Sequence, residues 1–339
     1  MKRTFFTISL LASLAIVTCI ALVSCANRKN LSDDKPKTTG DGGYQTLPDT
    51  AYSGKTLFGA KIQHDKSENQ IYVAKQMHLS CIRPSSISMD TYTSLPEPLV
   101  QFHKAGFICV TNVNATNTSG SNIVEYLHGA DTIQFKKAFK QLCEDVKNNI
   151  GVDNFIAVIE NEPINLKYYK GDFKNYLEEL RMCIEIAKPY HIKVVSGAMH
   201  LQLVQAVKDK ITGDIRVEHT RQLMDFERTH EVYATNIHHK FQPEKSKRDI
   251  SDFVSLSKWL SNYTGHAVMT NEISMKGVTP QLITGYLKMA REANYPIYMF
   301  WSGDTFNGVR SAGSNSAGDA LNSGGTLSEL GKAVAEFKK

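Results

Sequence analysis

The chain has 339 residues, of which 42% are hydrophobic and 22% are charged, so it is long enough for one large folded domain and too apolar for a disordered protein. Its formal net charge is +5, and removing Lys2 and Arg3 with the first segment leaves it close to neutral. Without a basic cluster or a zinc-type cysteine spacing, the sequence gives no reason to expect a nucleic-acid partner.

Residues 1–25 form a separate segment. Two basic residues precede an apolar run from Phe5 to Val23, which is the pattern of an export signal. A cleaved secretory signal and a single membrane span are the alternatives, because the run is about as long as a spanning helix. Its end, Leu-Val-Ser-Cys25, resembles the lipobox of bacterial lipoproteins. That resemblance implies acylation of Cys25 and a lipid anchor in the bacterial cell envelope. Ala26 stands where an aspartate would favour inner-membrane retention, so an outer-membrane or surface location is permitted.

The next segment, residues 26–50, is polar and rich in Lys, Asp, Thr and Gly. It has no hydrophobic period and predicts a flexible tether. The body, residues 51–339, is then expected to form one domain. Export makes a disulfide possible, but the four body cysteines lie in apolar or helix-like runs. Buried free thiols are therefore the better prediction for Cys81, Cys109, Cys143 and Cys183.

In the body, short β-prone runs alternate with amphipathic stretches, which is typical of β/α units around a parallel sheet. Helices are predicted over Gln134–Asn149, Phe173–Ala187 and Leu327–Phe337, and a Ser/Gly/Asn-rich loop over Ser311–Gly325. Eight strands predict an α/β fold, a closed (β/α)8 TIM barrel. An open doubly wound sheet is the alternative, but no Gly-rich phosphate turn follows the first strand. The predicted strands are Leu57–Ile62, Leu79–Ile82, Phe107–Val113, Phe155–Ile159, Ile192–Val195, Val232–Ile237, Ala267–Thr270 and Ile297–Phe300.

Two of these strands lead into an asparagine followed by a glutamate. Asn161-Glu162 follows the fourth strand and Asn271-Glu272 follows the seventh. The glutamates are 110 residues apart, which corresponds to three barrel units of about 37 residues. Because catalytic groups of such barrels gather at the carboxyl ends of the strands, we expect both carboxylates to face one cleft, as glycoside hydrolysis requires.

With this placement the sequence resembles the clan A glycoside hydrolases, which are retaining enzymes built on (β/α)8 barrels. The resemblance implies that Glu162 is the general acid/base, that Glu272 is the nucleophile and that Asn161 binds the sugar 2-hydroxyl. Arg83, after the second strand, matches the clan's arginine beside the nucleophile, where a cation favours the charged carboxylate. Neither a cofactor nor a metal is expected.

Two further residues match the clan at the ends of later strands. His238, after the sixth strand, stands where the clan has a Tyr or His beside the nucleophile. His239 remains an alternative, because strand parity points only one of the two inward. Trp301, at the end of the eighth strand, matches the tryptophan that lies under the cleaved sugar. Three loop aromatics could stack on sugars or face solvent, namely Tyr168, Tyr169 and Phe241.

Glu160 departs from the clan pattern. It shares strand parity with Glu162, so we expect it to point into the barrel. There it could bind a sugar hydroxyl, raise the pKa of Glu162 further, or itself be the acid.

The predicted function is a retaining glycoside hydrolase that cleaves β-linked glycan, with endo action on a polysaccharide favoured over exo action. Its two carboxyl groups should lie about 5 to 5.5 Å apart. The pKa of the acid, Glu162, should be raised by burial and by the charge on Glu272.

Two other functions are considered beside this one. The first is a non-catalytic surface lipoprotein that binds glycan on a barrel scaffold. The second is a metal-dependent hydrolase, for which only His238-His239 and His64-Asp65 supply suitable ligands near strand ends. The expected partners are an oligo- or polysaccharide and, through Cys25, a membrane; the protein itself is expected to be monomeric.

Overall fold

The computed structural model describes residues 56–62, 66–116, 124–129, 131–240, 250–274, 278–302 and 320–338. All of them belong to one unit, Thr46–Lys339. The predicted signal segment with Cys25, the tether, His64-Asp65 and Phe241 lie outside the described residues. Within the described part, no helix is both long and apolar enough to span a membrane.

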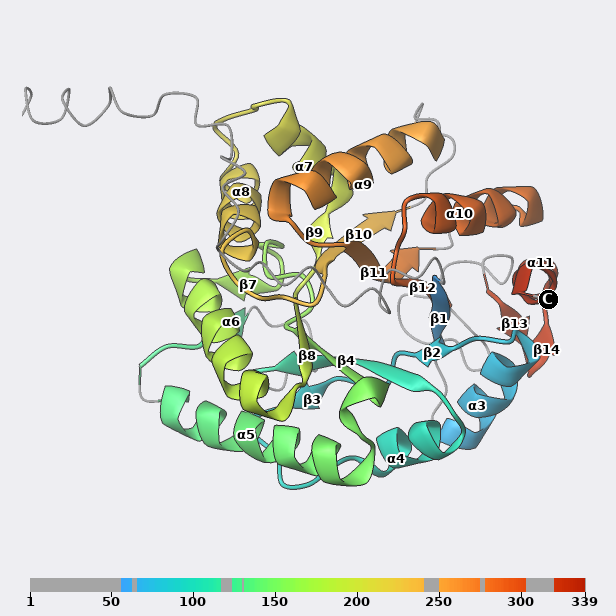
Figure 1. Cartoon of the computed structure of the whole chain (residues 1–339), viewed down its shortest axis with the longest axis horizontal. Helices are drawn as coiled ribbons and strands as arrows, with labels where there is room; N and C mark the ends of the chain where they lie inside the picture. Colours follow the sequence, from blue (N-terminus) through green and yellow to red (C-terminus); the bar gives the residue numbers. More distant parts are fainter. Residues whose placement is uncertain are drawn as a thin grey trace, which may run out of the picture. The chain divides into compact units, whose positions relative to one another are not determined.

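Eight parallel strands follow one another around a ring, and the predicted (β/α)8 barrel is confirmed (Figure 1). The last strand pairs with the first, with Leu57 opposite Ile297. Between the fifth and sixth strands the ring is joined by the Tyr233 N–H, which donates to the Val194 carbonyl at 2.8 Å. The strands are β1 (Leu57–Ile62), β2 (Cys81–Ile82), β4 (Ile108–Asn114), β6 (Phe155–Ile159), β8 (Lys193–Ser196), β10 (Thr235–Lys240), β11 (Val268–Ser274) and β12 (Ile297–Ser302).

Two short strands extend this sheet at the carboxyl ends of its neighbours. β3 (Ile87–Ser88) pairs with the end of β4, and β9 (Met199–His200) pairs with β10. β5 (Val124–Glu125) and β7 (Tyr169–Lys170) form a separate two-stranded sheet. The extra strands lie in the connections that follow barrel strands, which is where a site on this fold is built.

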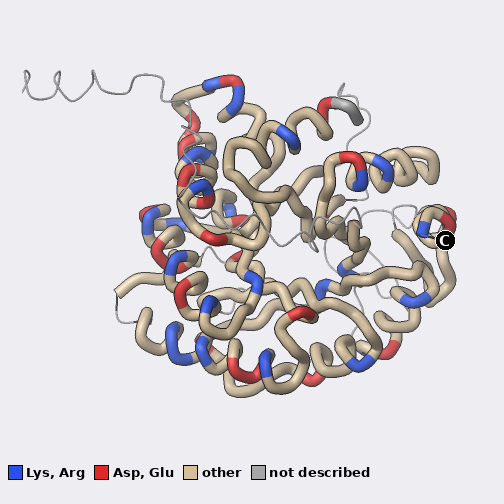
Figure 2. The backbone as a smooth tube through the Cα atoms, in the orientation of Figure 1, with Lys and Arg blue, Asp and Glu red and all other residues tan. Residues whose placement is uncertain are grey.

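Helices surround the ring of strands (Figure 1). Asp172, Asp214 and Thr279 cap α6, α8 and α10, because each side chain accepts a hydrogen bond from a backbone N–H of the first turn. Lys, Arg, Asp and Glu are interspersed along the outer helices (Figure 2). The helices are α3 (Ser67–Gln76), α4 (Glu97–Lys104), α5 (Asp131–Asn149), α6 (Phe173–Ala187), α7 (Leu201–Lys208), α8 (Ile215–Glu227), α9 (Ile250–Thr264), α10 (Pro280–Glu292) and α11 (Glu329–Lys338).

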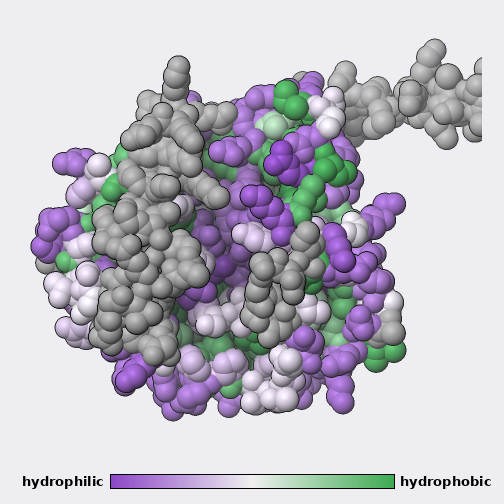
Figure 3. Space-filling view, turned by 180° about the vertical axis from the view of Figure 1, so that it is seen from behind, coloured by the Kyte–Doolittle hydropathy of each residue, from purple (hydrophilic) through white to green (hydrophobic). Residues whose placement is uncertain are grey.

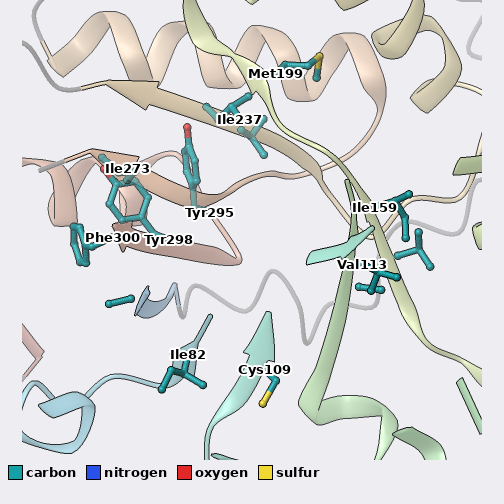
Figure 4. Packing of buried hydrophobic residues seen from close by; sticks show 14 of the residues in the cluster. Ile82, Cys109, Val113, Ile159, Met199, Ile237, Ile273, Tyr295, Tyr298 and Phe300 are labelled. Carbon is teal, nitrogen blue, oxygen red and sulfur yellow. The ribbon is translucent and has the colours of Figure 1, made fainter. Parts of the chain in front are cut away.

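Successive side chains along each strand point to opposite faces of the sheet, and this separates two layers of apolar side chains. One cluster, from one face of the sheet, includes Val110, Val158, Met269 and Met299. The larger cluster joins the other face of the strands to the helices, and Figure 4 shows members of it, such as Ile82, Val113 and Ile273. Continuous burial on both faces explains why the strands read as unbroken apolar runs.

The four body cysteines are buried free thiols, as predicted. The predicted loop Ser311–Gly325 needs a correction in its described part, residues 320–325. Asn322–Ser323 forms β13, which pairs antiparallel with β14 (Thr326–Leu327). Gly324 and Gly325 both have positive φ and make the tight turn between the two strands. In the view of Figure 3, hydrophilic residues cover most of the described surface.

Candidate active site

The loop after β6 brings Asn161 and Glu162 to the carboxyl end of the barrel. Glu160, directly after the strand, has φ 60°, so the chain turns before it reaches this pair. Pro163 then packs over Gly197, at the end of β8. A Cβ atom at position 197 would lie 2.4 Å from the Pro163 Cδ and 2.8 Å from the Ile159 carbonyl oxygen. Glycine is therefore required where this loop crosses the next strand.

Glu162 and Glu272 face each other, as the sequence predicts. One carboxylate oxygen of each, together with a ring nitrogen of His238, lie within 4.8 Å of one another. The side chain of Glu162 is 11% exposed and that of Glu272 is 23% exposed, so both remain partly open to solvent. Two carboxyl groups are thus brought together from strands on opposite parts of the ring.

Arg83 joins the two Asn-Glu pairs. Its Nη1 donates to Glu272 Oε2 at 2.7 Å and to the Asn271 carbonyl at 3.2 Å, and its Nη2 donates to Asn161 Oδ1 at 2.8 Å. The arginine is almost fully buried, so this ion pair is poorly screened by water. The geometry fixes the carboxylate of Glu272 and the amide of Asn161 relative to each other.

Trp301, at the end of β12, lies beside this ion pair. The Arg83 Cζ is 5.6 Å from the centre of its ring, and the Lys61 Nζ is 5.2 Å from it. Lys61 was not predicted as a site residue. Burial, and secondarily the charge of Arg83, lowers the pKa of Lys61 to about 8.

Glu162 is held by two histidines and an asparagine. The Nδ1 of His238 lies 3.0 Å from Glu162 Oε1, and the Nε2 of His200 lies 3.5 Å from Oε2. Asn165 Nδ2 donates to Oε2 at 2.8 Å. Burial alone would raise the pKa of Glu162, but the hydrogen bonds and charges of the histidines hold it well below its usual range. The expected upward pKa shift is therefore wrong, and the reason is the pair of histidines, of which His200 was not foreseen.

Of the two adjacent histidines on β10, His238 contacts Glu162 and His239 points away from the two glutamates. His239 is buried against Phe253, Tyr286 and Tyr298, and neither of its ring nitrogens has a hydrogen-bond partner among the described residues. Burial lowers the pKa of His239 to about 3, so it is a neutral core residue.

Three asparagines lie beneath the pair in one hydrogen-bonded chain. Asn271 Nδ2 donates to Asn112 Oδ1 at 3.2 Å, and Asn236 Nδ2 donates to Asn271 Oδ1 at 3.0 Å. The Nε2 of His238 lies 2.7 Å from the same Asn271 oxygen. Asn112 and Asn236 were not predicted, although each is a buried polar residue within a predicted strand.

The structure corrects the expectation for Glu160. Its backbone φ of 60° reverses the alternation of the strand, so its side chain does not share the direction of Glu162. Glu160 Oε1 accepts from the Ala115 N–H at 2.7 Å, and Oε2 accepts from the Tyr169 hydroxyl at 2.5 Å. It also contacts Glu179 of α6, and burial raises the pKa of both carboxyls. Glu160 is a buried structural acid rather than a sugar ligand.

Of the two loop tyrosines, one is buried and the other is exposed to solvent. Tyr169 is buried by its contact with Glu160 and stacks on Tyr126. Tyr168 is 49% exposed, and its pKa is raised by partial burial and by the negative charges of Glu162 and Glu272. Tyr168 is therefore the loop aromatic that lies near the carboxylate pair.

Glu162, His238 and Glu272 are close enough to be tested as ligands of a cation. Arg83 already contacts Glu272, and both nitrogens of His238 face other partners, Asn271 and Glu162. The guanidinium supplies the positive charge that a metal would bring. This donor set therefore fits a paired acid and nucleophile better than a metal site.

No protein-family model and no curated protein matches the chain. Its fold does match solved structures. XacCel5A in complex with cellopentaose aligns over 84% of this chain and 99% of its own, with a TM-score of 0.59 and 7% identity. The chain has the barrel fold of known glycoside hydrolases. An endocellulase from Pyrococcus horikoshii aligns over 84% of this chain and 93% of its own (TM-score 0.54, 11% identity). A GH128 (subgroup II) endo-β-1,3-glucanase from Sorangium cellulosum aligns over 82% and 97% (TM-score 0.52, 12% identity).

Proposed function

We propose that the protein is a retaining glycoside hydrolase that cleaves β-linked glycan, with Glu162 as acid/base and Glu272 as nucleophile. The observation that carries the proposal is that one carboxylate oxygen of Glu162 and one of Glu272 lie within 4.8 Å of each other. Inverting enzymes keep their carboxyl groups about 6.5 to 9.5 Å apart to leave room for water, whereas retaining enzymes need about 5 to 5.5 Å. The close approach of one oxygen from each carboxylate therefore supports double displacement.

The surroundings of the two carboxylates support unequal roles. Glu272 contacts Arg83, and a carboxylate paired with a fixed cation is suited to attack the anomeric carbon. Glu162 contacts two histidines, which can carry a proton for the leaving oxygen. Water activated by Glu162 would then release the sugar from Glu272 with retained configuration.

The same proposal gives roles to the neighbouring side chains. Asn161, whose Oδ1 is held by Arg83, would present its amide nitrogen to the sugar 2-hydroxyl. Trp301 would form the floor of the cleaved sugar's subsite, and Tyr168 would contact an adjoining sugar. Because the similar structures include an endocellulase and an endo-β-1,3-glucanase, we propose an endo-acting enzyme on β-glucan. We further propose a monomer anchored to the cell envelope through lipid on Cys25.

A covalent label tests the mechanism. We would incubate the full chain with the 2,4-dinitrophenyl 2-deoxy-2-fluoro-β-glycosides of cellobiose and of laminaribiose, and map adducts by peptide mass spectrometry. The expected result is one glycosyl adduct on Glu272 and none in Glu272→Gln, because the fluorine slows release of the intermediate. Glu160→Gln is the matched control, since this nearby glutamate contacts the helix layer, and it should be labelled like the wild type.

Two results would overturn the proposal. The first is an adduct on another residue, or hydrolysis by Glu272→Gln at the wild-type rate. The second is affinity for β-glucan without turnover of any glycoside, which would favour the glycan-binding lipoprotein.

A further inference from the structure

The asparagine chain beneath the carboxylate pair is anchored on a backbone group at each end. At one end Asn112 Nδ2 donates to the Glu160 carbonyl at 3.0 Å. At the other end Asn236 Oδ1 accepts from the Asn271 N–H at 3.3 Å. A backbone carbonyl only accepts and a backbone N–H only donates, so the orientations of both amides are determined.

These anchors determine the orientation of the amide between them. Asn112 must turn its Oδ1 toward Asn271, which requires Nδ2 of Asn271 on that side. Asn236 must turn its Nδ2 toward Asn271, which requires Oδ1 of Asn271 on the other side. Both ends of the asparagine chain require the same orientation of the Asn271 amide. In this orientation the Asn271 oxygen is the atom that faces His238.

The tautomer of His238 follows from this orientation. Its Nε2 lies 2.7 Å from the Asn271 oxygen, which can only accept, so Nε2 must carry a hydrogen. In a neutral imidazole with Nε2–H, the Nδ1 is a bare acceptor. Yet Nδ1 lies 3.0 Å from Glu162 Oε1, which is also an acceptor when ionised. Two lone pairs at this distance repel each other unless a proton lies between them.

We propose that Glu162 and His238 share one proton, held between Oε1 and Nδ1, and that Asn112, Asn236 and Asn271 are positioning residues that make this proton obligatory. The inference rests on the proposed function of Glu162 as the acid. It explains how a carboxylate surrounded by proton-binding histidines can still donate, because the proton for the leaving group is stored on the pair. His238 thereby acts in proton transfer as well as beside the nucleophile.

The pair loses one proton in the first step of the catalytic cycle and regains one in the second. In the first step Glu272 bonds to the anomeric carbon, the bond to the leaving oxygen breaks, and that oxygen takes the proton of the pair. In the second step the water oxygen bonds to the anomeric carbon and the bond to Glu272 breaks; one proton of the water goes to the pair and the other stays on the new sugar hydroxyl.

Among the described residues, charged and titratable groups from several elements lie around the Glu162–His238 pair. Glu272 on β11 lies within 4.8 Å, with Arg83 bound to it, and His200 on β9 contacts the other oxygen of Glu162. Tyr168 is near enough for both glutamates to raise its pKa, after partial burial, and His239 lies on the opposite side of β10. Of the residues that the structure describes, His200 is thus the one further group in direct contact with Glu162 that could also take up a proton.

The tautomer can be observed without relying on activity. Long-range 1H–15N NMR spectra of the full chain labelled with 15N-histidine distinguish protonated from bare ring nitrogens. The signals of His238 are identified by their loss in His238→Gln and, should that variant not fold, by their shift in Glu162→Gln. We expect Nε2 of His238 to be protonated throughout pH 5 to 8. A bare Nε2 with protonated Nδ1 in this range would overturn the inference.

A pH profile provides a second readout. Asn271→Asp places a carboxylate against the Nε2–H of His238, which strengthens retention of the shared proton. The basic limb of kcat/KM for phenyl β-cellobioside or β-laminaribioside should move to higher pH, whereas an unchanged limb in the folded variant would refute proton sharing. Absence of hydrolysis by the wild type would refute the proposed function alone, because the NMR result is independent of turnover.

Discussion

Glu227, at the end of α8, permits a quantitative test of the structure. Its carboxylate accepts hydrogen bonds from Ser196 Oγ at 2.6 Å and Thr235 Oγ1 at 2.7 Å, and the side chain is fully buried. Burial raises the pKa of Glu227 from 4.5 to about 7, because the two hydrogen bonds only partly offset the lost hydration. The carboxyl group therefore binds its proton more tightly in the folded state than in the unfolded chain.

The sign of the effect follows from proton linkage. The stabilising contribution of Glu227 is fully present below pH 4.5, its unfolded value, and is lost as the pH rises through 7. One pKa unit corresponds to about 1.4 kcal/mol, so this single group should lower the free energy of unfolding by about 3 kcal/mol between pH 4 and pH 8. Glu227→Gln keeps the shape of the side chain and removes the titration.

The assay is urea unfolding at several pH values, followed by tryptophan fluorescence. The stability difference between Glu227→Gln and the wild type should change by about 3 kcal/mol in favour of the variant between pH 4 and pH 8. Glu292→Gln, an exposed change on α10, is the matched control. An equal stability difference at both pH values would refute the assignment of a buried, proton-binding carboxyl to Glu227.

Three further predictions concern single side chains. Arg83→Lys replaces the two guanidinium nitrogens that bridge Glu272 and Asn161 with a single nitrogen on a shorter side chain. Loss of one charge-assisted hydrogen bond of about 1.5 to 3 kcal/mol should lower kcat/KM roughly 10- to 100-fold, measured in steady-state assays. Tyr168→Ala should raise KM several-fold on an oligosaccharide while leaving the hydrolysis rate of an aryl monosaccharide unchanged; a fall in that rate would contradict a role in sugar binding alone. The four body thiols should not react with Ellman's reagent until the protein unfolds. Burial raises the pKa to about 12 for Cys81, Cys109 and Cys143, and well above 9 for Cys183. Rapid reaction of any of these thiols in the folded protein would contradict this.

Much of the fold could be predicted from the sequence, because parallel strands buried on both faces are short continuous apolar runs. β1 and β6 have the predicted bounds, and the other six strands overlap their predicted ranges. The two glutamates and Arg83 were also accessible, since residues directly after such strands collect at one end of a barrel. Strand order alone was enough to bring these three together.

Other features could not be predicted from alternation. Glu160 turns away from the site because of one left-handed backbone residue, and the sequence has neither Gly nor Asn there to signal it. His200 lies on β9, a two-residue strand too short to show a period. Its approach to Glu162 depends on how the ring closes between β8 and β10. The downward pKa shift of Glu162 was missed for the same reason, because it depends on neighbours from other strands.

Gly197 has a consequence for anyone who wishes to move this site into another barrel. The Glu162-Pro163 turn lies against the bare Cα of the neighbouring strand, with no room for a methyl group. The backbone N–H of Gly197 also donates to the Tyr176 hydroxyl at 2.8 Å, and that hydroxyl donates to the Ile159 carbonyl at 3.2 Å. A graft that carried the acid, the nucleophile and the arginine but left alanine at this position would displace the acid from its histidines. The smallest transferable unit of this site therefore includes a residue with no side chain.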